Sequence, residues 1–219
     1  MKLSERTIKV LKNFNTINQS LVVNPGNVLS TVSKSKNVLA SVEVDETFDT
    51  PFAIYEISRF LGIVSLYKNP ELTFGEDSLV VSERNNSVKY TYADPTQIVS
   101  PPQNTVTLPS VDVEFELKQA DLDHVLRGAS ILGVDTIAFV GDGSKILLKA
   151  YDERNPTSDS TFAVIADSDL EFTAMYKTQI LTMLPLDYNV KLCKDGVSQF
   201  SGQDNKVNYW IALESTSQF

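Results

Sequence analysis

Residues 94–110, DPTQIVSPPQNTVTLPS, divide the chain into two halves. The stretch holds four of the chain's nine prolines, one acidic residue and no basic residue. Proline fixes φ and has no N–H to donate, so neither a helix nor a central strand can run through the stretch. A proline-rich connector of this length is typical of a linker or a functional loop. We therefore expect two domains, residues 1–94 and 111–219, joined by a linker over residues 95–110.

The composition fits two globular domains. The chain has 219 residues, 42% of them hydrophobic and 21% charged, which is enough material for two cores. Its one cysteine, Cys193, excludes an intramolecular disulfide and fits a reducing compartment. We find no apolar run of the roughly 18 residues that a membrane span needs and no signal-peptide core. We expect a soluble intracellular protein.

Hydrophobic periodicity predicts helices alternating with antiparallel hairpins. Apolar residues recur at three- and four-residue spacing in residues 2–17, as in an amphipathic helix. Residues 38–44 alternate as a half-buried strand does. Thr50 and Pro51 could serve as N-cap and first residue of a second helix. The predicted helices are residues 2–17, 53–67, 119–132 and 174–184.

The two halves repeat one plan: a helix, strands, a short helix introduced by an aromatic residue, and strands. Residues 52–55 (FAIY) in the first half are echoed by residues 172–176 (FTAMY) in the second. An internal repeat of this kind decides the fold class before any single motif does. It predicts an α+β fold of two similar domains, each with two helices packed on an antiparallel sheet.

The sequence offers few residues that could form a catalytic or metal site. His124 is the only histidine, so any histidine-based nucleophile pair or metal site would have to use it. Residues 141–145 (GDGSK) lack the spacing of a phosphate loop and predict a hairpin turn. Residues 167–169 (DSD) lack the glycine and the distal acid of a calcium loop. We predict no catalytic residue, no metal site and no cofactor.

Charge is unevenly distributed along the chain. The net charge is −9 and the pI is about 4.6, which on average disfavours nucleic acid. The helical windows 2–13, 53–67, 116–132 and 171–184 nevertheless carry eight basic and six acidic residues. The remaining residues carry 11 basic and 22 acidic residues. The helices are thus positive relative to an acidic remainder, and the first helix contributes most of that difference.

Several short motifs together resemble the sliding clamps of T-even-type bacteriophages, which are DNA polymerase processivity factors. The first is the opening MKLS with residues 11–18, LKNFNTIN. The others are residues 53–55 (AIY), 60–66 (FLGIVSL), 93–95 (ADP), 135–138 (DTIA), 208–209 (NY), 212–214 (ALE) and the terminal Phe219. Each motif is weak alone, but together they run in order from one end of the chain to the other.

The resemblance implies the DNA clamp fold, also found in PCNA: a ring of three two-domain subunits with helices lining the hole. Inward helices would meet phosphates through loosely placed basic side chains, so that the ring could slide. The residues expected to face the DNA are Lys2, Arg6, Lys9, Lys12, Arg59, Lys118, Arg127 and Lys177. A solvated face of an amphipathic helix remains the alternative interpretation of the basic residues in the first helix.

The resemblance also implies partners. These are double-stranded DNA, the replicative DNA polymerase, an ATP-dependent loader and, for late transcription, a sigma-like factor, all in the cytoplasm of an infected bacterium. Polymerase peptides would dock in an apolar groove bordered by the linker and the last strands. Trp210 would be exposed if its strand alternates regularly. The residues expected to bind partners are Ile98, Val99, Val106, Leu108, Trp210 and Phe219.

Two other classes stay open from the residues alone. A structural or scaffold protein of a virion can also be repeated, β-rich and acidic. An enzyme with an unrecognised site is the third possibility. The repeat with a helix pair in each half favours the clamp, because three such chains give a ring with six similar parts.

Overall fold

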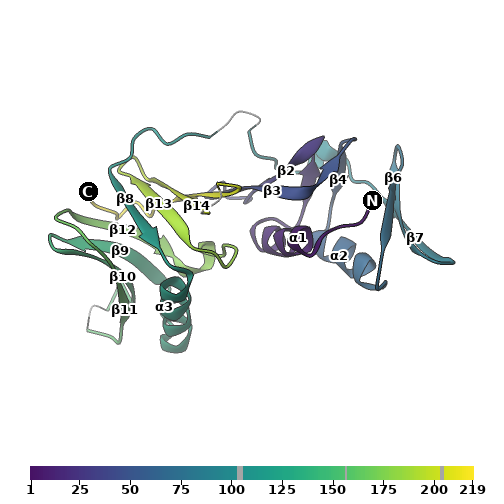
Figure 1. Cartoon of the computed structure of the whole chain (residues 1–219). Coiled ribbons are helices and arrows are strands. Elements are labelled where there is room, and N and C mark those ends of the chain that lie inside the picture. The colour runs from purple at the N-terminus through teal and green to yellow at the C-terminus, as the bar shows by residue number, and fades with distance from the viewer. Residues whose placement is uncertain (103–105, 156, 203–204) are drawn as a thin grey trace. The chain divides into compact units, whose positions relative to one another are not determined.

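The computed structural model describes residues 1–102, 106–155, 157–202 and 205–219. The chain divides into two compact units, Met1–Asn104 and Thr105–Phe219. Each unit combines helix with antiparallel sheet (Figure 1), which confirms the predicted α+β class.

Unit 1 contains two α-helices, which lie side by side, and several antiparallel strand pairings (Figure 1). Strands β5, β6 and β7 form one sheet in that order, β1 pairs with β4, and β2 pairs with β3. The elements are α1 (Glu5–Ile17), β1 (Leu21–Val23), β2 (Gly26–Val32), β3 (Val38–Phe48), β4 (Phe52–Ile54), α2 (Ile57–Ser65), β5 (Glu71–Phe74), β6 (Ser78–Glu83), β7 (Asn86–Thr91) and the 3₁₀ turn η1 (Pro95–Gln97).

Helix α1 forms where the sequence predicts it. Ser4 is its N-cap, and the Ser4 hydroxyl accepts the Thr7 N–H at 3.1 Å. Glu5 lies in the first turn, where a carboxylate interacts favourably with the helix dipole. The face that α1 buries consists of Thr7, Val10, Leu11 and Phe14.

A carboxylate from β3 fixes the start of α1. Glu46 is buried and accepts hydrogen bonds from the Ser4 backbone N–H and from the Thr7 hydroxyl. The Thr7 side chain is itself fully buried. Glu46 therefore satisfies one helix-terminal donor and one buried hydroxyl at once.

Replacing Glu46 by alanine is expected to lower the free energy of unfolding by about 1–3 kcal/mol, because two donors lose their acceptor. Urea denaturation monitored by circular dichroism measures this change in the free energy of unfolding. Asp45→Ala is the matched control, since Asp45 is exposed on the same strand. Equal denaturation midpoints for the two variants would show that Glu46 does not hold α1.

The second helix is shorter than predicted. Residues 53–67 were expected to be helical, but Phe52–Ile54 is strand β4, paired with β1, and α2 begins at Ile57. Thr50 and Pro51 are therefore not its cap. All three residues of β4 are buried, and a short strand buried on both faces shows no alternation that distinguishes it from a helix.

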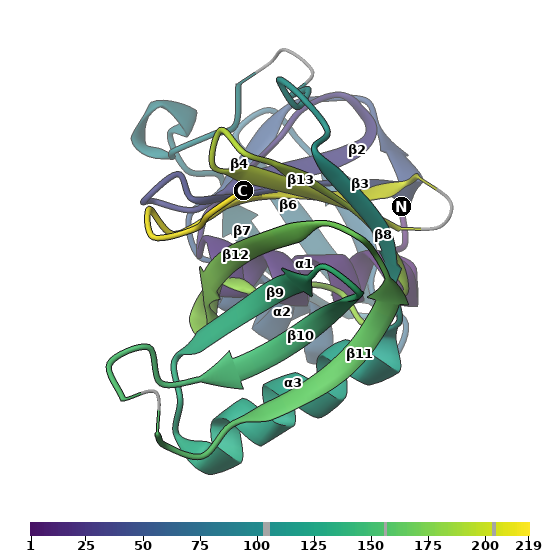
Figure 2. The same cartoon turned by 90° about the vertical axis from the view of Figure 1, so that its left-hand side faces the viewer.

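Unit 2 has two four-stranded antiparallel sheets, in the orders β11-β10-β9-β12 and β8-β13-β14-β15. Helix α3 lies along β10 and β11 (Figure 2), over the residue range that the sequence predicts. The elements are β8 (Val113–Leu117), α3 (Gln119–Leu132), β9 (Thr136–Asp142), β10 (Lys145–Tyr151), β11 (Thr161–Asp167), β12 (Glu171–Lys177), the 3₁₀ turn η2 (Thr178–Ile180), β13 (Tyr188–Cys193), β14 (Val197–Gly202) and β15 (Val207–Ala212).

The prediction of a helix over residues 174–184 is wrong. Glu171–Lys177 is strand β12, paired with β9, and only Thr178–Ile180 forms a single 3₁₀ turn. Met175 is buried although it lies on the face opposite Ala174, because the C-terminal segment covers it: the Glu214 N–H donates to the Met175 carbonyl at 2.8 Å. Burial on both faces hides the two-residue period. In the described part of unit 2, α3 is thus the one α-helix, not one of a pair.

Aromatic side chains fill the core of unit 2. Phe139 of β9 contacts Phe115 of β8 and Phe200 of β14, with ring centroids 4.9 and 6.3 Å apart. Tyr176 of β12 packs edge-on against Phe139 at 6.0 Å. These contacts join the two sheets into one packed core.

Candidate DNA-facing and partner-binding surfaces

One side of α1 is basic. Arg6, Lys9 and Lys12 follow one another at three-residue spacing, opposite the buried face; the two lysines are exposed and Arg6 is half-buried. Neither lysine lies within ion-pair distance of a carboxylate in the described chain. Lys2 precedes the helix, with its Nζ 3.7 Å from Glu71 Oε1, and both side chains are well exposed. Lys9 and Lys12 therefore present their positive charge to solvent. Arg59 is exposed on the neighbouring α2.

The basic residues predicted in unit 2 are paired with acids. Lys118 is the N-cap residue of α3, and its Nζ lies 3.2 Å from Asp187 Oδ2 and 3.5 Å from Glu116 Oε2. Arg127 lies one helical turn beyond Asp123, with 3.7 Å between Nη2 and Oδ2. Helix α3 carries Asp121 and Asp123 against Arg127 and is not basic overall.

Lys177 does not lie on a helix, as was expected, but at the end of β12. Its Nζ is 3.5 Å from Asp135 Oδ2 and 3.4 Å from the Thr136 hydroxyl. A hydrogen bond from the Thr136 hydroxyl, and then the charge of Lys177, lower the pKa of Asp135. The carboxylate therefore stays ionised at neutral pH and offsets the charge of Lys177.

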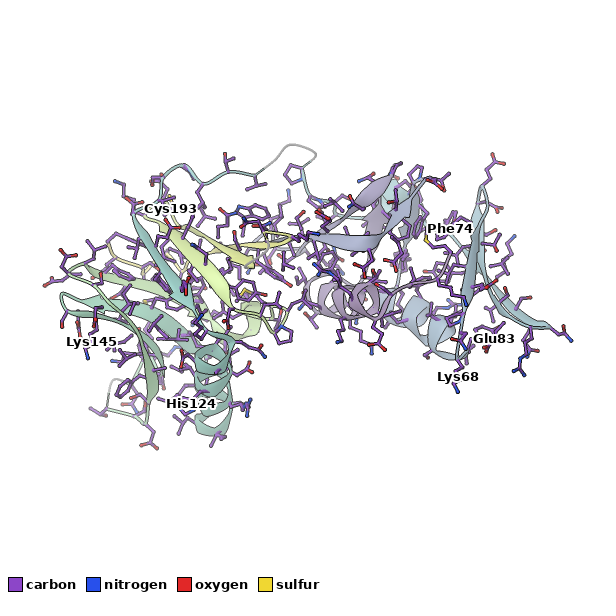
Figure 3. All side chains as sticks on the ribbon, in the orientation of Figure 1. Lys68, Phe74, Glu83, His124, Lys145 and Cys193 are labelled. Carbon is purple, nitrogen blue, oxygen red and sulfur yellow. The ribbon has the colours of Figure 1, made fainter. Side chains whose placement is uncertain are left out.

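The start of α3 is fixed by Asp187. Its Oδ1 accepts the Gln119 N–H at 2.8 Å, and this backbone hydrogen bond, followed by Lys118, lowers the pKa of Asp187. The hydrogen bond from Lys118 to Asp187 in turn raises the pKa of Lys118. A hollow of about 590 Å³ lies beside this pair, lined by Gln119, Ala120, Asp123, His124, Arg127 and Asp187. His124 lies on α3 and is exposed (Figure 3).

The predicted partner-binding residues of the linker differ in exposure. Ile98 is 8% exposed, whereas Val99 is 41% exposed. Val106 and Leu108 are half-buried and belong to unit 2, while Ile98 and Val99 belong to unit 1. The turn η1 begins the linker. Asp94 accepts the Thr96 N–H at 2.9 Å and the Thr96 hydroxyl at 2.7 Å. The hydroxyl, and then the N–H, lower the pKa of Asp94.

Trp210 and Phe219 lie in unit 2. The strand alternates as predicted, with Tyr209 and Ile211 buried, but Trp210 is half-buried and not exposed as was expected. Phe219 is 43% exposed and stacks on Phe172, with ring centroids 5.9 Å apart and ring planes inclined by 13°. The neighbouring Gln218 exchanges two backbone hydrogen bonds with Thr173, at 2.8 and 2.9 Å. The terminal phenylalanine is thus held against the end of β12.

An exposed apolar surface, not foreseen from the sequence, lies at the edge strand β11. Phe162 and Val164 are 58% and 49% exposed on one face of this strand. Gly128 of α3 approaches Thr161 so closely that an added Cβ would lie 2.5 Å from its Cγ2. The last turn of α3, with Ile131 84% exposed, therefore lies near the same edge. The alternation of residues 161–165 predicts a strand, but the local sequence does not distinguish an edge strand from a central strand.

Unit 1 also has an edge strand. Strand β7 ends the sheet β5-β6-β7. Tyr90 of β7 packs edge-on against Phe60 of α2, with ring centroids 5.7 Å apart. Leu66, which ends α2, is 68% exposed. Helix α2, which contacts β7 through Phe60, therefore ends in an exposed apolar side chain.

The fold is that of the PCNA-like clamps. The chain superposes on A. fulgidus PCNA, solved with the C-terminal region of FEN-1 bound, with a TM-score of 0.72 at 14% identity; the match covers 97% of this chain and 96% of that one. For PCNA from Thermococcus kodakaraensis the TM-score is 0.70 at 17% identity, covering 95% and 96%. These similarities define the class as a two-domain clamp.

Sequence comparison identifies the family. Residues 2–100 match the family described as DNA polymerase processivity factor, and residues 114–215 match that described as gp45 sliding clamp, C terminal. The sliding clamp of Vibrio phage KVP40 is 30% identical over 222 residues, covering 98% of this chain and 100% of the relative. That of Enterobacteria phage T4 is 29% identical over 230 residues, covering 99% and 98%. The chain belongs to the sliding-clamp family of T-even-type phages, the DNA polymerase processivity factors.

Among the described residues, the His, Cys, Asp and Glu side chains form no group of three or more that could hold a metal ion. No helix in the described chain is long and apolar enough to span a membrane.

Proposed function

We propose that three copies of this chain close into a ring that encircles duplex DNA and slides along it. The observation that carries the proposal is the basic side of α1, formed by Arg6, Lys9 and Lys12 in a chain of net charge −9. Lysine and arginine bind phosphates without reading bases, so contacts of this kind permit movement along the duplex. The acidic remainder would keep DNA away from the other surfaces.

The eight expected DNA-facing residues contribute unequally to this proposal. Arg6, Lys9, Lys12 and Arg59 supply most of the attraction from unit 1. Lys2, Lys118, Arg127 and Lys177 each lie within 4 Å of a carboxylate, so their net attraction for phosphate is smaller. Helix α1 is therefore the principal DNA-contacting element.

Edge strands support closure of the ring. In our proposal β11 of one copy adds to β7 of the next, so that each interface joins unit 2 of one chain to unit 1 of another. Strand β11 is seven residues long and carries one charge, at Asp167, whereas free edges are usually protected by charge or proline. Phe162, Val164 and Ile131 would be covered at the interface. Such a head-to-tail contact closes into a ring when the rotation is one third of a turn.

The partners follow from the tethering role. We propose that Ile98, Val99, Val106, Leu108, Trp210 and Phe219 border the surface that binds the replicative polymerase. The relative that resembles this chain in fold, A. fulgidus PCNA, binds the C-terminal region of FEN-1, which supports capture of partner segments. An ATP-dependent loader would open the ring, and a sigma-like factor would use it in late transcription. A tether of this kind performs no catalysis itself, and it acts in the cytoplasm of the infected bacterium.

Retention on circular DNA tests the ring directly. After loading onto a nicked circle, the protein is expected to stay bound in high salt, which screens contacts to phosphate but cannot open a topological link. Cutting the circle once should release it, and blocking both ends of the linear DNA with bound streptavidin should restore retention. Salt-induced loss from the circle, or equal retention on unblocked linear DNA, would contradict encirclement.

A further inference from the structure

A buried amide connects the end of α1 to the linker. Asn18 is the C-cap residue of α1 and is only 4% exposed. Its Nδ2 donates to the Val32 carbonyl at 2.9 Å and to the Val99 carbonyl at 3.3 Å. Its Oδ1 accepts the Ser20 N–H at 3.0 Å. One side chain thus joins the end of α1, the end of β2 and the linker.

These bonds require an amide in one orientation. Two backbone carbonyls need donors and one N–H needs an acceptor, and the Asn18 side chain offers both in a single group. Aspartate has nearly the same shape but would set a carboxylate against two carbonyl oxygens. Alanine would leave all three backbone groups without this partner, and the Val32 carbonyl among them is buried. The contacts are therefore specific to asparagine.

The bond to Val99 fixes which linker side chain is presented outward. Ile98 is buried, and its N–H donates to the Pro95 carbonyl at 3.2 Å. Val99, whose carbonyl is held by Asn18, is 41% exposed. The Ser100 hydroxyl closes the turn on the Ile98 carbonyl at 3.4 Å. The linker therefore leaves unit 1 with one apolar side chain anchored and the next one facing outward.

We infer that Asn18 is a positioning residue for partner binding: it holds the linker in the conformation that presents Val99 to the polymerase. This inference rests on the proposed role of the linker in capturing polymerase. Asn18 itself does not contact the partner. A free linker would have to be ordered at each binding event, and that ordering weakens affinity.

Two variants and one control test the inference. Asn18→Ala removes the three bonds, whereas Asn18→Asp keeps the acceptor for Ser20 and removes both donors. Asn15→Ala is the control, because Asn15 is half-buried near the same end of α1 and outside these bonds. Polymerase stimulation on primed circular DNA is measured over a range of polymerase concentrations. Native mass spectrometry shows whether the trimer forms. Hydrogen exchange of the Ile98 amide shows whether the linker stays ordered.

Both Asn18 variants are expected to need about three- to tenfold more polymerase for half-maximal stimulation, with the maximum unchanged. Exchange at Ile98 should rise while trimer mass stays as in wild type. Faster exchange at Ile98 with an unchanged polymerase requirement would overturn the inference, and so would a lower maximum accompanied by loss of the trimer in both variants. If wild type and Asn15→Ala also failed to stimulate polymerase, the proposed function itself would be wrong.

Discussion

The triple variant Arg6→Glu, Lys9→Glu, Lys12→Glu reverses three charges on α1. We expect it to load onto DNA several tens of fold less well than wild type. Each phosphate contact contributes about 0.9 to the slope of log affinity against log salt concentration. Three contacts therefore change the affinity for DNA by about 40-fold when the salt concentration changes fourfold. Reversal adds repulsion to that loss. None of the three residues belongs to the buried face of α1, so the fold and the ring should be retained.

The measurement is loader-dependent loading and polymerase stimulation at several salt concentrations. The matched control reverses three exposed lysines in unit 2, Lys145, Lys194 and Lys206, which lie at or near hairpin turns (Lys145 is labelled in Figure 3). This control changes the net charge by the same amount and should load like wild type. Equal loss in the two triple variants would show that total charge matters and not its place on α1. Unchanged stimulation in the α1 variant would exclude α1 as the DNA-facing element.

The fold could be predicted where one face of a helix or strand is buried and the other face is exposed to solvent. Helix α1 and strand β3 have that pattern and were placed correctly within a few residues. The two errors, at Phe52–Ile54 and at Glu171–Lys177, concern strands covered on both faces. Strand β12 is covered by residues some forty positions later in the chain, beginning at Glu214. A local window cannot contain that information.

The same distinction applies to the candidate sites. The basic stripe on α1 is a local pattern and was visible in the sequence. The compensation of Lys118 by Asp187, 69 residues away, was not. Nor could the sequence reveal that Asn18 reaches a linker residue 81 positions later. The family could be inferred from the resemblance of short motifs. Which basic side chains are not paired with acids could be seen only from the three-dimensional contacts.

The second large effect is expected at the proposed subunit interface. Phe162→Glu combined with Val164→Glu should convert the proposed trimer to monomers and abolish processivity. Both side chains are about half exposed in the isolated chain and occupy an edge strand, so neither substitution removes core packing from unit 2. Within an interface, however, each would place a carboxylate against apolar surface without a partner.

Loss of an aromatic anchor commonly costs more than 2 kcal/mol of binding free energy, and buried unpaired charges add to that cost. We therefore expect the loss of the aromatic side chain alone to weaken each interface by at least about 25-fold, because 1.4 kcal/mol corresponds to tenfold in affinity, and the buried charges weaken it further. A closed ring needs all interfaces at once, so the effect on the ring exceeds the effect on a single contact. Sedimentation velocity or native mass spectrometry gives the mass directly.

The matched control is Val111→Glu with Leu186→Glu. Val111 is 48% exposed, almost the same as Val164, and Leu186 is 38% exposed, but neither lies on an edge strand. This variant should remain trimeric despite an equal gain of negative charge and the loss of two exposed apolar side chains. A trimeric Phe162/Val164 variant would show that β11 is not the interface. If both variants were monomeric, charge repulsion would be the cause of dissociation. If only the β11 variant were monomeric, ring closure would depend on that edge strand.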